Sequence, residues 1–171
     1  MRKVIVAGTV VIAAAGVSWF LLPKSWLYQN RRPTYLGKLV NRVWAGLATV
    51  GLSPEFQVAL EVRQRRSGES QLIPLVVARV DGERYVVSML GERADWVRNV
   101  RAARGEAVIR TRHREDVTLE DVPAAERAPI LKAYLARAPG GRPHFPIGPD
   151  AAVEEFALLA DEYPVFRVVP R

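Results

Sequence analysis

The stretch LIPLVVARVDGERYVVSML, residues 72–90, decides the fold of this 171-residue chain. Two valine-rich runs, at residues 72–80 and 84–90, flank the dipeptide Asp81-Gly82. Both central positions of a type I′ turn need a positive φ angle, so Asp-Gly between two apolar runs is a strong hairpin signal. The stretch therefore predicts two antiparallel strands joined by a tight turn.

Similar segments rich in valine and isoleucine lie on both sides of this hairpin. They predict further strands at residues 56–64, 107–112, 116–122 and 165–169. Helical periodicity predicts four helices, at residues 34–52, 93–104, 124–138 and 151–163. No parallel βαβ repeat occurs in this order of segments. We therefore expect an α+β fold in which an antiparallel β-barrel or sandwich carries covering helices.

An apolar segment near the N-terminus, residues 4–22, contains no charged residue. At a rise of 1.5 Å per residue a helix of this length measures roughly 28 Å, close to the hydrocarbon thickness of a bilayer. Basic and aromatic residues flank it, as in a membrane anchor: Arg2, Lys3, Lys24, Trp26, Tyr28, Arg31 and Arg32. We expect a transmembrane helix within residues 1–23, and a cleaved secretory signal is the alternative.

The basic residues that follow the apolar segment outnumber those that precede it. By the positive-inside rule, we expect a single-pass protein of the cell membrane with its domain in the cytoplasm. Residues 24–54 would form a linker and an amphipathic helix with Lys38 and Arg42 on its polar side. That helix would pack on the domain, residues 55–171, or lie on the membrane surface, and the sequence leaves both possibilities open.

Composition limits the possible chemistry. The chain has no cysteine and two histidines, which excludes disulfides and thiolate sites and disfavours a histidine-rich metal site. It contains no nucleophile elbow and no Walker loop, so redox or transfer chemistry would come from a cofactor. The net charge of +7 suits an anionic ligand or lipid surface. The arginines lack interleaved aromatic residues, so we expect no nucleic-acid partner.

A basic turn lies between the first two predicted strands. It has the sequence Arg65-Arg66-Ser67-Gly68, which can present side-chain and backbone donors to an anion such as phosphate. The alternative is an exposed hairpin turn with solvated arginines. Pro74 then removes a ladder donor from the second strand, so we expect an edge there or a place where a ligand meets the backbone.

Further polar candidates follow the third strand. Ser88 precedes Gly91 and is either an ordinary strand-end serine or a hydroxyl near a bound ring. Trp96 and Asn99 share one face of the predicted helix at residues 93–104. Because a buried amide needs partners, the simplest expectation for Asn99 is a hydrogen bond to a neighbouring loop.

Together with the C-terminal PVFRVVPR, residues 164–171, these motifs resemble the deazaflavin-dependent nitroreductase and quinone reductase family. The resemblance extends over residues 35–171. It implies a split β-barrel related to flavin-binding oxidases. It also implies hydride transfer from reduced coenzyme F420 to an electron-poor small molecule, such as a quinone, an enone or a nitroaromatic compound.

The resemblance assigns coenzyme contacts to ten residues: Arg65, Arg66, Ser67, Gly68, Pro74, Leu75, Ser88, Gly91, Trp96 and Asn99. The basic turn would hold the phosphate region, and Pro74 with Leu75 would pass along the ring. Ser88 and Gly91 would border the reactive face, which Trp96 and Asn99 support. Ser88 is also the candidate catalytic residue, because its hydroxyl would stabilise negative charge on the acceptor.

His113 and Tyr134 are weaker candidates for a catalytic role. An FMN- or haem-binding split barrel is an alternative, and so is a non-catalytic module that binds a ligand or lipid. The sequence leaves the oligomeric state open.

Overall fold

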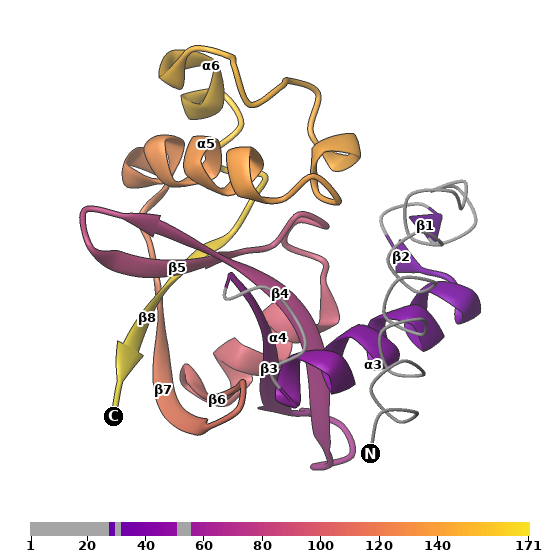
Figure 1. Cartoon of the computed structure of the whole chain (residues 1–171). Coiled ribbons are helices and arrows are strands. Elements are labelled where there is room, and N and C mark those ends of the chain that lie inside the picture. Colours follow the sequence, from indigo (N-terminus) through magenta and orange to yellow (C-terminus); the bar gives the residue numbers. More distant parts are fainter. Residues whose placement is uncertain (1–27, 30–31, 51–55) are drawn as a thin grey trace, which may run out of the picture. The chain divides into compact units, whose positions relative to one another are not determined.

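The computed structural model describes residues 28–29, 32–50 and 56–171, and the chain separates into two compact units, Met1–Lys38 and Leu39–Arg171 (Figure 1). The expected transmembrane segment, residues 4–22, lies outside the described residues. Within the described ranges, no helix has both the length and the apolar character needed to cross a membrane.

The first unit contains a small antiparallel ladder that the sequence did not predict. It pairs β1 (Tyr28–Gln29) with β2 (Arg32–Pro33). Helix α3 (Tyr35–Thr49) follows and continues into the second unit. The Thr34 hydroxyl accepts a hydrogen bond from the Gly37 backbone N–H at 3.1 Å, the usual way in which a threonine caps a helix start.

Six antiparallel strands of the second unit close into a barrel in the order β3-β4-β5-β8-β7-β6 (Figure 1). Their bounds are β3 Gln57–Arg63, β4 Ser70–Val80, β5 Glu83–Val87, β6 Glu106–Arg110, β7 Arg114–Asp121 and β8 Val165–Pro170. Every strand expected from the sequence is present, and the α+β barrel is confirmed. The Asp81-Gly82 turn is confirmed too, with φ angles of 50° and 83°.

Strand β4 changes partner along its length. Residues 70–76, the first half, pair with β3, whereas residues 77–80, the second half, pair with β5. Within the described chain the first half therefore has no ladder partner on its β5 side. Pro74 lies in this half opposite Ala59, which is the edge position expected for a proline in a strand. Because β4 pairs with β3 along its first half and with β5 along its second half, the barrel is of the split type.

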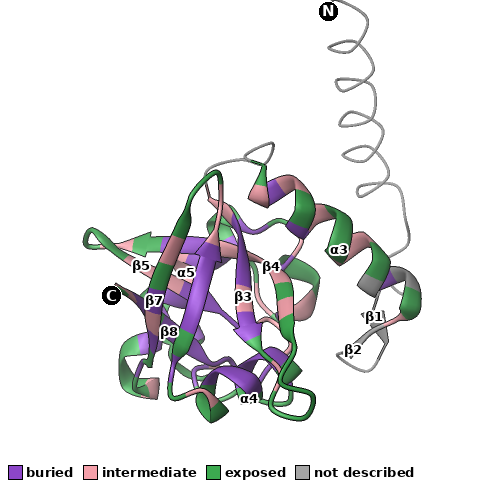
Figure 2. Ribbon diagram, turned by 90° about the horizontal axis from the view of Figure 1, so that it is seen from below, coloured by how far each residue is buried: buried purple, intermediate pink, exposed green. Residues whose placement is uncertain are grey.

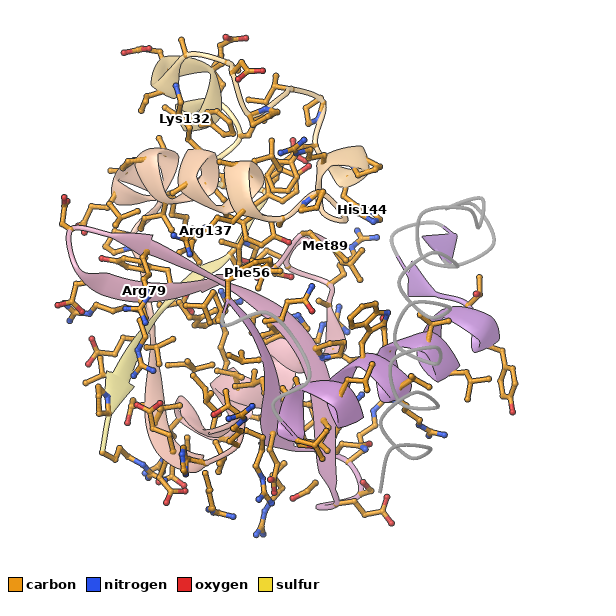
Figure 3. The ribbon with its side chains drawn as sticks, viewed as in Figure 1. Phe56, Arg79, Met89, Lys132, Arg137 and His144 are labelled. Carbon is orange, nitrogen blue, oxygen red and sulfur yellow. The ribbon has the colours of Figure 1, made fainter. Side chains whose placement is uncertain are left out.

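Helix α4 (Asp95–Ala102) lies between β5 and β6 and turns its buried residues toward the barrel interior. The helix expected at residues 124–138 is a short 3₁₀ segment, η1 (Ala124–Glu126), followed by α5 (Arg127–Arg137). Another 3₁₀ turn, η2 (Arg142–His144), follows in the loop after α5. Lys132 on α5 donates to the Ala151 carbonyl at 2.9 Å, which ties α5 to the segment before α6 (Figure 3).

The helix expected at residues 151–163 was predicted too long. Only α6 (Val153–Ala157) is α-helical. Beyond it the backbone forms i to i−3 bonds, such as Leu159 N–H to the Phe156 carbonyl, which tighten the chain into turns. The reason is burial, because these turns place Tyr163 with no exposed surface in the core under α5.

The buried residues form two large clusters on either side of the barrel wall. One fills the barrel and is built from strand residues and α4, including Leu60, Val86, Val97 and Phe166. The other lies between the barrel wall and the α5–α6 region. In it Phe145 stacks on Tyr163 with ring centroids 4.0 Å apart. Among the functional candidates, Trp96 belongs to the first cluster and Leu75 packs against it.

Helix α3 contacts the barrel through its small residues. Ala45 and Ala48 are buried against Ala59 of β3, whereas Leu39 and Val43 are each 49% exposed. The physical reason is close approach, because small side chains let a helix backbone come near a strand and leave the larger residues outside. The larger apolar residues are therefore divided between the surface, at Leu39 and Val43, and half-buried positions, at Val40, Trp44 and Leu47.

Candidate functional site

The basic turn between β3 and β4 is tight and mostly exposed. The Gly68 backbone N–H donates to the Gln64 carbonyl at 2.9 Å, and the Gln64 N–H donates to the Glu69 carbonyl at 2.8 Å. Gly68 has φ +73°, in the left-handed region where a glycine is unstrained. Arg66 and Ser67 point their side chains into an exposed part of the turn. The exposed Arg66 guanidinium is therefore accessible to an anion, whereas the Ser67 hydroxyl donates to Gln64 Oε1 at 3.4 Å and accepts from the Glu69 N–H at 3.3 Å.

Arg65 fastens this turn to helix α4. Its backbone N–H and Nη1 donate to Asn99 Oδ1 at 3.3 and 2.9 Å. Its guanidinium also contacts Asp95 Oδ1, at 3.3 Å from Nη2. Asn99 is 3% exposed, so Arg65 supplies the partner that a buried amide requires. The hydrogen bond from Asn99 to a neighbouring loop is the one that the sequence suggested.

An apolar surface lies against the barrel core near this turn. Ile73 and Leu75 of β4, and Leu90 of the loop after β5, are partly buried against the same cluster as Trp96. The Trp96 ring lies 5.5 Å from the Phe166 ring, centroid to centroid, and the residue is 7% exposed. Trp96 therefore forms a rigid base, while the three aliphatic residues keep part of their surface exposed.

The loop after β5 is held by its own hydrogen bonds. Ser88 is 1% exposed, and its hydroxyl donates to the Gly91 carbonyl at 2.9 Å. The Gly91 N–H returns a bond to the Ser88 carbonyl at 3.1 Å, and Gly91 adopts φ +77°. The Ser88 proton is therefore already donated within the loop. Contact with an acceptor would require this bond to be exchanged.

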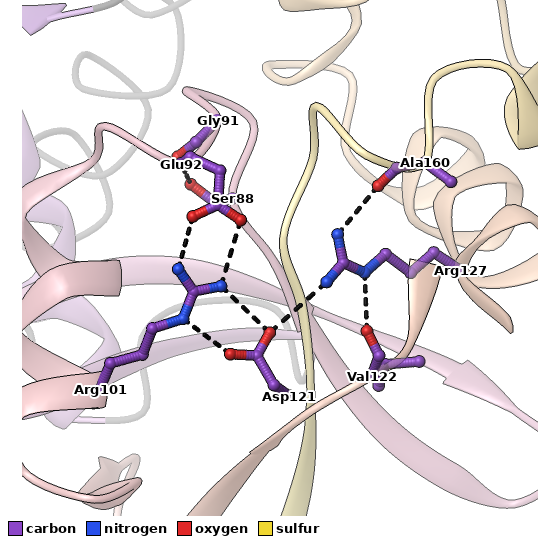
Figure 4. Close-up of polar contacts among 8 residues, drawn as sticks. All are labelled: Ser88, Gly91, Glu92, Arg101, Asp121, Val122, Arg127 and Ala160. Atoms are coloured by element: carbon purple, nitrogen blue, oxygen red, sulfur yellow. Dashed lines mark hydrogen bonds and ion pairs between the residues drawn. The ribbon is translucent and has the colours of Figure 1, made fainter. Parts of the chain in front are cut away.

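An arginine network that the sequence did not suggest braces the same loop (Figure 4). Arg101 on α4 binds both Glu92 and Asp121, and its guanidinium lies 5.7 Å from the Phe166 ring centroid. The hydrogen bond to Glu92, and then that to Asp121, raise the pKa of Arg101. Arg127 continues the network, 3.5 Å from Asp121. No sequence motif marks these residues, because they meet only in the folded barrel.

The structure thus joins some predicted residues and separates others. Arg65, Trp96 and Asn99 meet through α4 and the basic turn. His113 lies exposed in the turn between β6 and β7, and Tyr134 belongs to the core under α5. These two weaker candidates therefore come from parts of the fold other than the basic turn and α4.

A cavity of about 260 Å³ opens at the second half of β4, beside the β4–β5 turn and the start of α5. Four carboxylates and one arginine are its charged lining residues: Asp81, Glu120, Asp121, Glu126 and Arg167. Its volume is slightly below the roughly 300–1,000 Å³ of ordinary ligand pockets. The shape of this cavity makes it a candidate ligand site, but its negatively charged lining disfavours any anionic ligand. The basic turn is the better candidate for such a ligand.

Several solved structures are similar to this chain. One described as a domain-swapped dimer is 18% identical, with a TM-score of 0.50 over 78% of this chain and 96% of that chain. The protein Atu2129 of unknown function, from Agrobacterium tumefaciens str. C58, is 11% identical, with a TM-score of 0.50 over 86% of this chain and 58% of that one. Likeness at this identity shows the fold alone.

A structure of an F420-H2 dependent reductase, FDR-A, is 19% identical, with a TM-score of 0.46 over 67% of this chain and 94% of that chain. None of the curated proteins matches the sequence. The model of the F420H(2)-dependent quinone reductase family matches residues 40–142, which is more than half of the chain. The chain therefore belongs to the F420H2-dependent quinone reductase family, which makes it an oxidoreductase with F420 as its coenzyme.

Proposed function

We propose that the protein transfers a hydride from reduced coenzyme F420 to a quinone, with enones and nitroaromatic compounds as alternative acceptors. The site would comprise the basic turn, the first half of β4, the Ser88–Gly91 loop and α4. One observation carries this proposal: the bond of Arg65 to buried Asn99 holds a basic turn beside half-exposed aliphatic residues. Charge and apolar surface are thus combined, as an anionic tail and a flat ring require.

The residues of the turn fit the anionic part of the coenzyme. Arginine offers five N–H donors, and bonds from a guanidinium to phosphate are among the stronger hydrogen bonds in proteins. Arg66 and the Ser67 hydroxyl lie at the exposed part of the turn, while Arg65 is oriented by α4. We infer that Arg65 positions the turn and that Arg66 and Ser67 make the outer contacts with phosphate.

The apolar surface formed by Ile73, Leu75 and Leu90 fits a planar ring. Covering half-exposed aliphatic groups removes apolar area from water at roughly 25 cal/mol per Å². The first half of β4 also has an edge without a ladder partner in the described chain, where a ring can meet backbone donors and acceptors. These groups would orient the ring and exclude water from one of its faces.

The coenzyme supplies the hydride when bound, so the protein has to position the two reactants and stabilise charge. We propose that the Ser88–Gly91 loop borders the acceptor. Its internal bonds and the Arg101–Glu92 pair would keep it in place. Ser88 would then act first through the shape of the loop. Its hydroxyl would reach a developing negative charge only by leaving the Gly91 carbonyl.

We further propose that residues 4–22 anchor the protein in the cell membrane with the domain in the cytoplasm. The length of the uncharged segment and its basic, aromatic flanks support this proposal. A bilayer also dissolves apolar quinones, so an anchored reductase would work beside its acceptor.

The test uses the full-length protein in detergent. Titration with F420, FMN and haem, followed by fluorescence or absorbance, should give binding of F420, and oxidation of reduced F420 should be faster with a quinone than with an enone or nitroaromatic compound. Binding of FMN alone would contradict the proposed function. Equal rates with all acceptors would contradict the quinone assignment.

The site itself is tested by replacing two arginines. The double variant Arg65→Ala, Arg66→Ala should bind F420 at least tenfold more weakly, because each lost charged hydrogen bond costs roughly 1.5–3 kcal/mol. Arg79→Ala is the matched control, since Arg79 is an exposed arginine in the second half of β4, the strand that follows the basic turn. Equal affinities of the double variant and the control would reject the basic turn as the phosphate site.

A further inference from the structure

The outward face of helix α3 is apolar, which is unusual for a surface helix. We call four exposed positions of the helix, Leu39, Arg42, Val43 and Gly46, together with Val50 directly after it, the α3 stripe. Leu39, Val43, Gly46 and Val50 recur at spacings of three and four residues, with Arg42 next to Val43, and therefore follow one side of the helix. Leu39 and Val43 are each 49% exposed and Val50 is 59% exposed. A surface helix normally turns charged residues to water, and Arg42 is the charged residue among these five.

Exposed apolar side chains are concentrated at this helix. In the described ranges, the exposed large hydrophobic residues away from α3 and Val50 lie in two places: Leu72 on β4, and Val153 and Leu158 at α6. Tyr35, the first residue of α3, is 88% exposed. Single exposed apolar residues are common, but a run of them along one helix indicates an interaction surface. Figure 2 shows how much of α3 is exposed.

Packing on the barrel does not need this stripe. The contact of α3 with β3 is made by Ala45 and Ala48 against Ala59. Rotating the helix to bury Leu39 and Val43 would expose these alanines and force larger side chains against the strand. The alanine contact therefore fixes the helix with its larger apolar residues outward.

A lipid surface is the partner that best matches the stripe and its surroundings. Interfacial helices place aliphatic residues at the acyl boundary and basic residues at the headgroups, and Arg42 is cationic in a chain of net charge +7. Twelve residues, 23–34, separate the uncharged segment at residues 4–22 from Tyr35. Twelve residues reach at most about 40 Å, so an anchor at residues 4–22 would hold α3 within reach of the bilayer.

We propose that the α3 stripe lies in the interface of an anionic bilayer, with Val43 and Val50 at the acyl boundary and Arg42 at lipid phosphates. The inference rests on the proposed membrane anchor and bilayer-resident acceptor. It adds a second contact that fixes how the barrel meets the membrane.

The absence of native cysteine allows a direct test in the full-length chain. Val43→Cys carries an environment-sensitive fluorophore, and Leu158→Cys is the matched control because Leu158 is 85% exposed outside α3. Both proteins are reconstituted into vesicles of phosphatidylglycerol and phosphatidylcholine, or of phosphatidylcholine alone. The label at residue 43 should shift to the blue and be quenched by nitroxide-labelled acyl chains, more strongly in anionic vesicles. The label at residue 158 should stay in water.

Other occupants give different results. A blue shift at residue 43 without quenching by labelled lipid would mean that protein covers the stripe, and would overturn the proposal. If that shift also disappears on dilution, a second copy of the chain is the occupant. A water-exposed label at residue 43 in a protein that still floats with vesicles would also overturn it. Turnover of reduced F420 with a water-soluble quinone is unaffected by these outcomes, so the proposed reductase function is judged separately.

A functional readout complements the labels. The variant Leu39→Gln, Val43→Gln should lose severalfold in kcat/KM with a long-chain quinone embedded in the vesicles. It should keep its rate with a short water-soluble quinone, because neither residue belongs to the barrel core. Leu158→Gln should leave both rates unchanged. Equal losses with the two quinones would mean that the stripe acts on the site itself, and would reject a role at the membrane.

Discussion

The two halves of strand β4 have opposite chemical surroundings. None of the residues 70–76 in the first half is fully buried, and the basic turn that contains Arg65 and Arg66 precedes it. The second half contains buried Val77 and Ala78 and lies beside the acidic cavity. A single strand thus contributes an accessible apolar edge at one end and packed core at the other.

This difference shows how the barrel can direct an anionic coenzyme without a deep pocket. Fixed charges of opposite sign at the two ends of one strand attract an anion to one end and repel it from the other. Among the described residues the first half has no ladder partner on its β5 side, whereas the second half is covered by α5. We therefore expect substitutions near the first half to change coenzyme binding, and those near the second half to change stability alone.

The largest effect should come from Trp96→Ala. Trp96 packs on Phe166 and on the core below the first half of β4, so its removal should lower the free energy of unfolding by about 3–5 kcal/mol. Coenzyme binding should weaken as well, because α4 holds the basic turn. Urea unfolding and F420 titration measure the two effects.

Tyr85→Ala is the matching substitution beside the second half of β4, since Tyr85 is half-buried and lines the acidic cavity. It should cost about 1 kcal/mol, the usual effect of a point substitution, and should leave F420 affinity unchanged. If Tyr85→Ala weakens F420 binding as much as Trp96→Ala does, the two halves of β4 do not differ in function.

Much of the fold follows from local sequence signals. The turn at Asp81-Gly82 sets the register of β4 and β5, and alternating valines mark the strands on either side. Helix α6 was predicted too long because its periodicity continues beyond Ala157, whereas burial of Tyr163 forces turns there. The contact of α3 with β3 could not be predicted, because spacing alone does not reveal that the small residues Ala45 and Ala48 are the buried ones.

The candidate site, too, was predictable from the sequence only in part. Its residue types were visible as motifs, but the bond from Arg65 to Asn99 joins residues 34 positions apart and depends on how α4 packs. The Arg101 network with Glu92 and Asp121 lies outside any motif, since charged residues are frequent throughout the sequence. Such pairs require the strand order of the barrel, which periodicity does not provide.

A paired glycine substitution gives a smaller and sharper test of the two halves. Gly68 precedes the first half with φ +73°, and Gly82 follows the second half with φ +83°. An added Cβ meets no atom at either position, so the cost of alanine is conformational, about 1–2 kcal/mol for each variant. Thermal unfolding should show similar losses for Gly68→Ala and Gly82→Ala.

Coenzyme affinity separates the two glycine variants. Gly68→Ala distorts the turn that we assign to the phosphate and should weaken F420 binding severalfold. Gly82→Ala should bind F420 as the unchanged protein does. Normal affinity in both variants would show that the backbone of the basic turn makes no contact with the coenzyme.

The smallest effect concerns two ion pairs, one beside each half of β4. Arg110 donates to Glu61 at 2.7 Å near the first half, and Arg84 donates to Glu115 near the second. These hydrogen bonds are the main reason that the pKa of each carboxyl lies below its usual 4.5. A folded-state pKa below the unfolded value means that the stabilisation is present above pH 4.5. It is lost as the pH falls through the folded pKa.

Glu61→Gln and Glu115→Gln should therefore each lower the free energy of unfolding at pH 7 by up to about 1 kcal/mol, the range for partly exposed pairs. Each variant should also lose less stability than the unchanged protein between pH 5 and pH 3, because one acid-sensitive group is gone. Urea unfolding at several pH values measures both effects. Parallel curves for a variant and the unchanged protein would show that its ion pair does not stabilise the fold. Neither carboxylate belongs to the basic turn, so F420 affinity at pH 7 should be the same in both variants. Acid sensitivity is therefore common to the two halves of β4, whereas coenzyme binding belongs to the first half.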